Sequence, residues 1–167
     1  MSTIVERVTA VIAAEDDIPE SNVEEKETAW WINARTFSGP SLEVVAHRGH
    51  AAVSARFAHP KQFALRATIN IFSTSSAALE KAVRIARREV KVLARAYDEL
   101  EHAGYTVTPG TGSNPYPGSG LTIRGDDGLL AWIHTEGLAG TFYVTGQRDK
   151  RGAHGRVYYD ALDAIDL

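Results

Sequence analysis

Apolar and polar residues recur with two different periods along this chain of 167 residues. The longest helical period covers residues from about 76 to 103. Its apolar positions recur at steps of four and three, so they form one continuous stripe along a helix. The residues of this apolar stripe are Leu79, Val83, Ala86, Val90, Leu93, Tyr97 and Leu100. Ser75 or Ser76 is placed to cap the first free N–H groups, and Gly104 is suited to a left-handed helix end. The pattern predicts one long amphipathic helix with a side that must be buried.

The same segment carries basic residues at the same steps, two positions out of phase with the apolar stripe. They form a row on roughly the opposite side of the helix, which we call the basic face. Its members are Lys81, Arg84, Arg88, Lys91 and Arg95, with Arg87 at the flank. Such a row suits an acidic partner, either a protein surface or the phosphates of a nucleic acid. The alternative is a solvated helix face, partly paired with Glu80, Glu89 and the acidic ends of the chain.

A period of two indicates β-strands on both sides of this helix. The clearest run is Phe63–Ile71, whose polar alternates indicate a sheet with one solvated face. Shorter strands are expected at Trp30–Phe37, Leu42–Arg48, Ala51–Ala58, Tyr105–Thr108, Leu121–Arg124, Leu129–His134, Thr141–Thr145 and Arg156–Tyr159. This order predicts an α+β fold, in which the long helix packs across an antiparallel sheet.

The length fits a single domain over residues 1–167. A short helix is expected within residues 1–14, followed by an acidic connector over 15–27. Glycine and proline mark residues 109–120 as a loop, and residues 147–155 are expected to form a second, basic loop. A helical turn is expected at the end of the chain, over 160–167.

The net charge of −3 conceals a strong segregation of charge along the chain. Residues 1–27 carry −6, residues 28–100 carry +6 and residues 101–167 carry −3. An acidic end of the chain can therefore neutralise the basic centre, within one subunit or across a subunit boundary.

Composition narrows the setting in which this chain works. It has no cysteine, which excludes disulfides and thiolate metal sites. The N-terminus lacks the pattern of a signal peptide, and no apolar run is long enough for a membrane span. We therefore expect no membrane association and a location in the cytoplasm, or in an assembly formed there.

The candidate chemical groups do not form a catalytic or metal-binding motif. His47 and His50, with His59, are the only histidine cluster, and no carboxylate stands at a spacing that completes a zinc site. His134 and Glu136 lack a nucleophile or an oxyanion donor beside them. The sequence predicts no catalytic residue, no metal site and no cofactor, and a protein that is not an enzyme.

The leading hypothesis is a non-enzymatic protein that binds other protein subunits, as a homo-oligomer or as a subunit or accessory of a larger viral or bacterial assembly. Adjacent tryptophans on a strand face opposite sides, so one of Trp30 and Trp31 is expected in the core and the other on the wetter face, and Trp31 is the candidate interface anchor. The predicted partner-binding residues are the basic face, Trp31, and Arg148, Lys150 and Arg151 of the basic loop. One alternative is nucleic-acid binding through the basic face. Another is a small-ligand-binding protein or an enzyme, with a pocket between helix and sheet.

Overall fold

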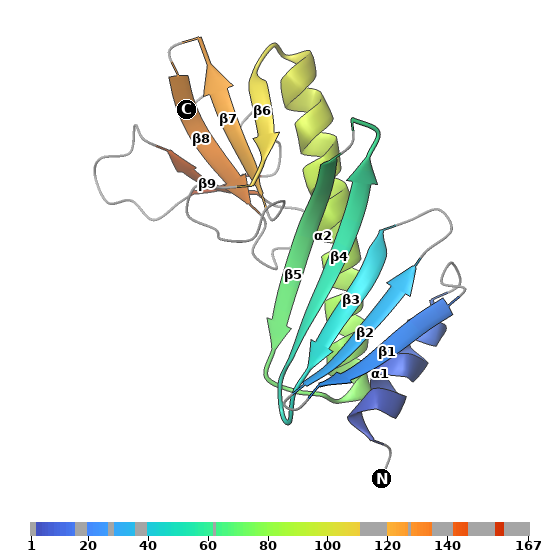
Figure 1. The fold of residues 1–167 in the computed structure, drawn as a ribbon. Helices are drawn as coiled ribbons and strands as arrows, with labels where there is room; N and C mark the ends of the chain where they lie inside the picture. Colours follow the sequence, from blue (N-terminus) through green and yellow to red (C-terminus); the bar gives the residue numbers. More distant parts are fainter. Residues whose placement is uncertain are drawn as a thin grey trace. The chain divides into compact units, whose positions relative to one another are not determined.

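A computed structural model describes residues 3–15, 20–26, 29–35, 40–61, 63–110, 120–126, 128–134, 142–146 and 156–158 of the chain. The first half contains α1 (Ile4–Ala13), β1 (Glu20–Lys26), β2 (Ala29–Arg35), β3 (Ser41–Ala46), β4 (Ala51–His59) and β5 (Phe63–Ile71). The second half contains α2 (Ser76–His102), β6 (Thr106–Pro109), β7 (Leu121–Gly125), β8 (Gly128–His134), β9 (Phe142–Gly146) and β10 (Arg156–Tyr158). The elements form the α+β fold that the sequence predicts (Figure 1).

The chain divides into two compact units. The first contains Met1–Phe57 and Thr68–Arg87, and the second contains Ala58–Ala67 and Arg88–Leu167. Both α2 and the β4–β5 hairpin contribute residues to each unit. The expected single domain over residues 1–167 stays a prediction.

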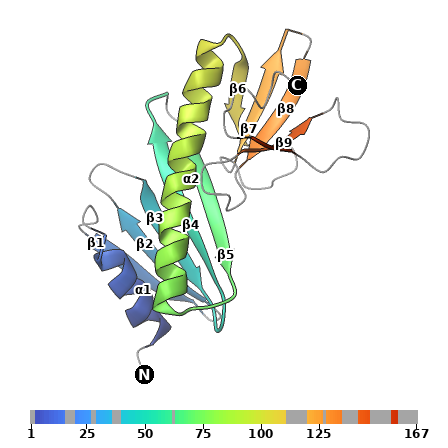
Figure 2. The ribbon, with the colours of Figure 1, turned by 180° about the vertical axis from the view of Figure 1, so that it is seen from behind.

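The first sheet has the strand order β1-β2-β3-β4-β5. Helices α1 and α2 lie on the same face of this sheet (Figure 2). The strands turn alternate side chains toward these helices, and those side chains are buried, among them Ile32, Leu42, Val44, Val53 and Leu65. The core therefore lies between the helices and one face of the sheet, and we call the other face the helix-free face.

The apolar stripe of α2 is buried as predicted. Every residue of the stripe is at most 6% exposed, from Leu79 to Leu100. Each large apolar side chain buried in this way contributes roughly 1.5–3 kcal/mol. The buried side is wider than the stripe, because a second row also packs inward: Ala82, Glu89 and Ala96. The alternative of a solvated helix face included pairing of the basic residues with Glu89, but its position in this second row leaves Glu89 fully buried.

Both ends of α2 follow the predicted capping chemistry. Ser75 is the cap at the start, since its Oγ accepts the N–H of Ala78 at 3.3 Å. At the other end the N–H of Gly104 reaches the carbonyl of Glu101 at 3.0 Å, and the N–H of Tyr105 reaches that of Leu100 at 3.1 Å. These two bonds form a Schellman motif, which requires the left-handed backbone of Gly104, whose φ is 94°.

The N-terminal segment differs from the prediction at one point. Helix α1 forms as expected, with a capping box between Thr3 and Glu6. The expected acidic connector over 15–27 contains strand β1, which pairs antiparallel with β2 through pairs such as Asn22↔Asn33. The five side chains from Ser21 to Glu25 are all exposed. An edge strand that buries no side chain has no period-two apolar signal, so the sequence pattern did not reveal it.

The second sheet has the strand order β10-β9-β8-β7-β6 and is antiparallel. Its buried residues include Val107, Leu121, Ile123 and Ile133. The strands predicted in this half of the chain are present, with bounds shifted by at most one residue. Most of the expected 109–120 loop, all of the expected 147–155 loop and the expected turn over 160–167 lie outside the described residues.

Candidate interaction surfaces

The basic face of α2 is exposed along its whole length. Its five members, Lys81, Arg84, Arg88, Lys91 and Arg95, all lie in the exposed class, opposite the buried stripe. From the first to the last, the row extends about 21 Å along the helix axis, at a rise of about 1.5 Å per residue. These five side chains therefore lie on the side of the helix that the sequence pattern predicts, opposite the apolar stripe.

Few internal acids neutralise this face. Only Arg95 among its members has an ion pair within the described residues, in which Nε lies 2.6 Å from Oε1 of Glu99, one turn further along α2. Lys81, Arg84, Arg88 and Lys91 form no hydrogen bond or ion pair with any described residue. Exposed cations that form no ion pair create a positive potential over the helix.

The acidic N-terminal segment reaches the flank of this face. Arg87 forms an ion pair with Glu15, just after α1, and the Arg87 side chain is 14% exposed. The same segment is tied down by Arg7, whose Nε donates to the carbonyl of Thr74 at 2.9 Å. Neutralisation by the acidic end therefore occurs within the chain at Arg87. Glu24 and Glu25 on β1 stay exposed.

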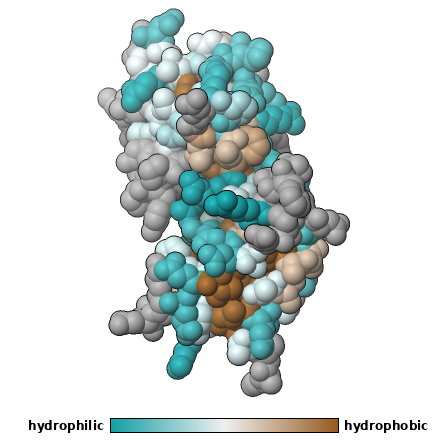
Figure 3. Space-filling view, turned by 45° about the vertical axis from the view of Figure 1, so that its right-hand side comes forward, coloured by the Kyte–Doolittle hydropathy of each residue, from teal (hydrophilic) through white to brown (hydrophobic). Residues whose placement is uncertain are grey.

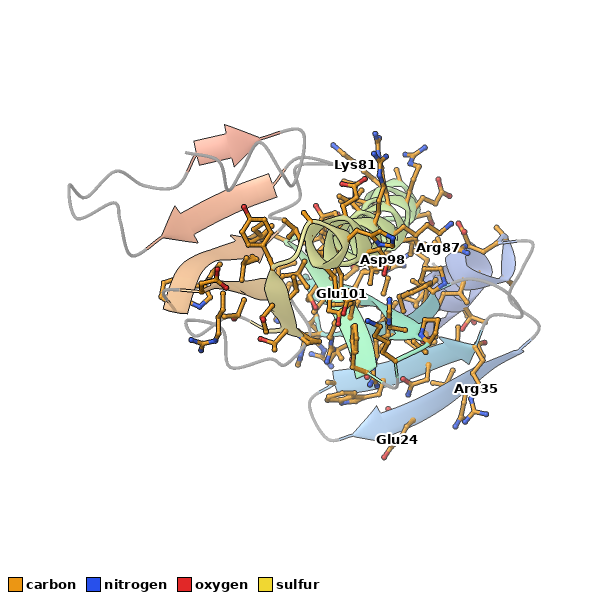
Figure 4. All side chains as sticks on the ribbon, turned by 90° about the horizontal axis from the view of Figure 1, so that it is seen from above. Glu24, Arg35, Lys81, Arg87, Asp98 and Glu101 are labelled. Carbon is orange, nitrogen blue, oxygen red and sulfur yellow. The ribbon has the colours of Figure 1, made fainter. Side chains whose placement is uncertain are left out.

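Trp31, another predicted contact residue, does not join the basic face. Trp31 is half-buried on the helix-free face, in register with Glu24 on β1 and Val45 on β3. Seen from above, Lys81 projects on the α2 side of the sheet, and Glu24 and Arg35 project on the opposite side (Figure 4). Arg148, Lys150 and Arg151 lie outside the described residues.

The three clustered histidines, His47, His50 and His59, form two separate arrangements. The rings of His47 and His50 stack at 4.5 Å beside the turn between β3 and β4. His59, at the end of β4, directs Nε2 toward Oδ1 of Asp98 on α2 at 3.1 Å, and its Nδ1 accepts the backbone N–H of Lys61 at 3.2 Å. Both nitrogens of His59 are therefore engaged in contacts that hold the hairpin against α2, rather than being available to a substrate.

An aromatic and charged cluster surrounds His59. Its ring stacks on Phe63 at 4.5 Å and lies 4.9 Å from the ring of Tyr97. Burial is the main cause that raises the pKa of Tyr97. Lys61 and Glu101 form an ion pair beside it, and their hydrogen bond lowers the pKa of Glu101 and raises that of Lys61. The cluster joins the hairpin to α2.

The helix-free face carries a polar site that the sequence did not reveal. Asn22, Asn33 and Glu43 stand side by side on β1, β2 and β3, because the register pairs Asn22 with Asn33 and Asn33 with Glu43. A hollow of about 540 Å³ lies over these strands. The sequence pattern did not indicate this site, because the register of β1 brings together polar residues that are distant in the sequence.

Exposed apolar side chains are few among the described residues. Phe72, between β5 and α2, is 93% exposed, and Val23 on the β1 edge is 41% exposed. In the space-filling view, apolar surface is confined to areas separated by hydrophilic side chains (Figure 3). Charge and hydrogen bonding are therefore the main means by which the described surface can recognise a partner.

Comparison with known proteins identifies no relative: no protein-family model, curated protein or solved structure matches this chain. Within the described ranges, no group of three or more His, Asp or Glu side chains is arranged to hold a metal ion. No helix among those residues has the length and apolar character needed to cross a membrane.

Proposed function

We propose that this chain is a non-enzymatic binding protein that uses the basic face of α2 to contact an acidic surface on another protein subunit. The observation that carries the proposal is the exposure of five cations on one side of a helix whose other side is buried. Four of them, Lys81, Arg84, Arg88 and Lys91, form no ion pair with a described residue. An acidic partner would gain several charge contacts without breaking internal ones.

The partner that fits most directly is a second copy of the chain. Strand β1 exposes Glu24 and Glu25 at the edge of the first sheet, while the basic face lies on α2. These two surfaces differ, so a contact between them is head-to-tail, which builds rings or larger assemblies. Charge complementarity of this kind supports the subunit role expected from the segregated charge of the sequence.

Light scattering after size-exclusion chromatography tests this proposal. At about 50 mM NaCl we expect the wild-type protein to have a molar mass above the 18.2 kDa of one chain. At about 500 mM NaCl its molar mass should approach that of one chain, because salt screens the charges. The double variant Arg84→Glu, Arg88→Glu should remain near 18.2 kDa at both salt concentrations. The control Arg48→Glu, Arg124→Glu changes the net charge equally at exposed positions outside α2 and should behave as wild type. A wild-type mass of one chain in both salts would refute the self-association.

The regular spacing of the basic face favours nucleic-acid binding as a second candidate. A straight row of five cations over about 21 Å suits the phosphates of a duplex. Fluorescence anisotropy with a labelled duplex tests it. Binding should weaken steeply with salt, with a slope of roughly −0.9 for each phosphate neutralised, and the Arg84→Glu, Arg88→Glu variant should show a shallower slope. Binding that does not depend on salt, or no binding, removes this candidate.

A further inference from the structure

The helix-free face of the first sheet contains a hollow that belongs neither to the basic face nor to the core. Its volume is about 540 Å³, within the range of small-molecule sites. The polar side chains that line it come from four neighbouring strands: Asn22, Asn33, Arg35, Ser41, Glu43 and Arg56. All of them belong to the first compact unit.

The strand register arranges these side chains in two rows. The first row crosses β1, β2 and β3 as Asn22, Asn33 and Glu43. In the second row Ser41 of β3 is the partner of Arg56 of β4, and the pairing of Ala34 with Leu42 places Arg35 beside Ser41. The two arginines thus stand on either side of a serine. At a strand spacing of about 4.8 Å, their backbones are roughly 10 Å apart.

The chemistry of the second row fits an anion. Arg35 and Arg56 are exposed, and neither side chain forms a hydrogen bond or ion pair with a described residue. A guanidinium offers five donors in a planar fork that matches a carboxylate or a phosphate. Two such groups flanking a hydroxyl can bind the oxygens of one anion from opposite sides.

The chemistry of the first row fits hydroxyl groups. The amides of Asn22 and Asn33 each offer donors and an acceptor, and the carboxylate of Glu43 accepts hydrogen bonds. Successive rows on one face of a strand lie about 7 Å apart, which is the length of a short carbon skeleton. A ligand with an anion at one end and hydroxyls at the other therefore matches both rows.

We propose that this hollow binds a small anionic polyhydroxylated molecule, with its phosphate or carboxylate between Arg35 and Arg56 and its hydroxyls on Asn22, Asn33 and Glu43. The site is separate from the basic face of α2, because Lys81 projects from the opposite side of the first unit (Figure 4). A phosphate and a carboxylate both supply the anion, and titration with three probes distinguishes the two.

Isothermal titration calorimetry with three probes tests the site. Glucose 6-phosphate carries the phosphate, gluconate carries the carboxylate, and glucose carries neither. We expect at least one of the two anions to bind in the micromolar to millimolar range and glucose to bind at least about tenfold more weakly. Binding of glucose 6-phosphate alone identifies a phosphate site, and binding of gluconate alone identifies a carboxylate site. Absence of binding by both anions, or equal binding of glucose, overturns the proposal.

Substitutions locate the binding. Arg35→Gln and Arg56→Gln should each weaken the bound anion at least about tenfold, and Arg56→Lys should retain part of the affinity because it keeps the charge. Arg48→Gln removes one charge from the segment between β3 and β4, outside the site, and should leave the affinity unchanged. All three positions are exposed, so the variants should fold as wild type. Equal loss in Arg48→Gln and Arg56→Gln would overturn the assignment, since it would show a non-specific charge effect.

Discussion

His59 lies 3.1 Å from Asp98, from the ring Nε2 to the carboxylate Oδ1, and this contact joins the end of β4 to α2. The backbone N–H of Lys61 points at the other ring nitrogen, so Nδ1 is the acceptor and Nε2 carries the proton that is donated to Asp98. The side chain of His59 is 6% exposed and that of Asp98 is 62% exposed. The histidine is thus a packed part of the hairpin, and the aspartate orients it from the surface.

The first prediction concerns this contact. His59→Ala removes a buried ring and two hydrogen bonds, so it should lower the free energy of unfolding by about 2–4 kcal/mol. Asp98→Asn keeps an oxygen that accepts the Nε2 proton and should cost less than about 1 kcal/mol. Urea unfolding of the two variants measures both values. An equal loss of stability in both variants would contradict this prediction. It would show that the charge of Asp98, rather than the packing of the His59 ring, provides the stability.

The second prediction is a dependence on pH. The hydrogen bond from Lys61 lowers the pKa of Glu101 below its ordinary 4.5, so its contribution to stability is present above that pH and is lost as the pH falls through the lowered value. The pKa of Lys61 is raised above 10.5, so its contribution is present below that pH and is lost only in stronger alkali. The ion pair therefore stabilises the protein between these limits.

Urea unfolding of Lys61→Met as a function of pH checks this sign. The variant should have a lower urea midpoint than wild type at pH 7, and the two midpoints should converge as the pH falls through the lowered pKa of Glu101. Arg48→Met is the control, since Arg48 is exposed and forms no ion pair with a described residue. A difference between wild type and Lys61→Met that persists unchanged at pH 2–3 would show that lost packing, not charge, is responsible.

The long helix was predictable because its signal is local. The 3.6-residue period alone predicts that Leu93 is buried and Arg95 is exposed. Ser75 and Gly104 mark the ends of the helix, because serine caps a helix start and glycine adopts the left-handed backbone of a helix end. The width of the buried side was less predictable. Glu89 is charged and lies at the border of the apolar stripe, so its full burial depends on the sheet beneath it.

The helix-free face was not predictable for the opposite reason. Arg35 and Arg56 are 21 positions apart in sequence, and they flank one serine only because β2, β3 and β4 pair in one particular register. The partners Asn22 and Asn33 depend further on β1, which has no apolar alternation of its own. Register is a property of the whole sheet, and single-strand periodicity does not contain it.

The third prediction tests the packing of α2. Leu93 is fully buried, whereas Lys91, two residues earlier, is exposed on the basic face. Leu93→Ala should lower the free energy of unfolding by about 2–5 kcal/mol through lost burial and a residual cavity. Lys91→Ala should change it by less than about 0.5 kcal/mol. Thermal and urea unfolding give both numbers, and a loss of similar size at both positions would be inconsistent with the observed helix orientation.

The fourth prediction concerns the end of α2. Gly104 has a φ of 94°, and a Cβ at this position would meet no atom within 4 Å. Any cost of Gly104→Ala therefore comes from the backbone and should be about 1–2 kcal/mol. Gly104→Asn should cost less, since asparagine tolerates positive φ better than alanine does. If the alanine variant is as stable as wild type, Gly104 does not hold this backbone conformation in solution.

The proposed function requires that the basic face of α2 binds an acidic surface. Its most direct test is fluorescence anisotropy of a labelled glutamate-rich peptide at about 50 mM NaCl, titrated with wild type, with Arg84→Glu, Arg88→Glu, and with the charge-matched control Arg48→Glu, Arg124→Glu. We predict that wild type and control bind alike and that the α2 variant binds at least about tenfold more weakly. Equal affinity of the α2 variant and the control, or no binding by wild type, would contradict the central claim.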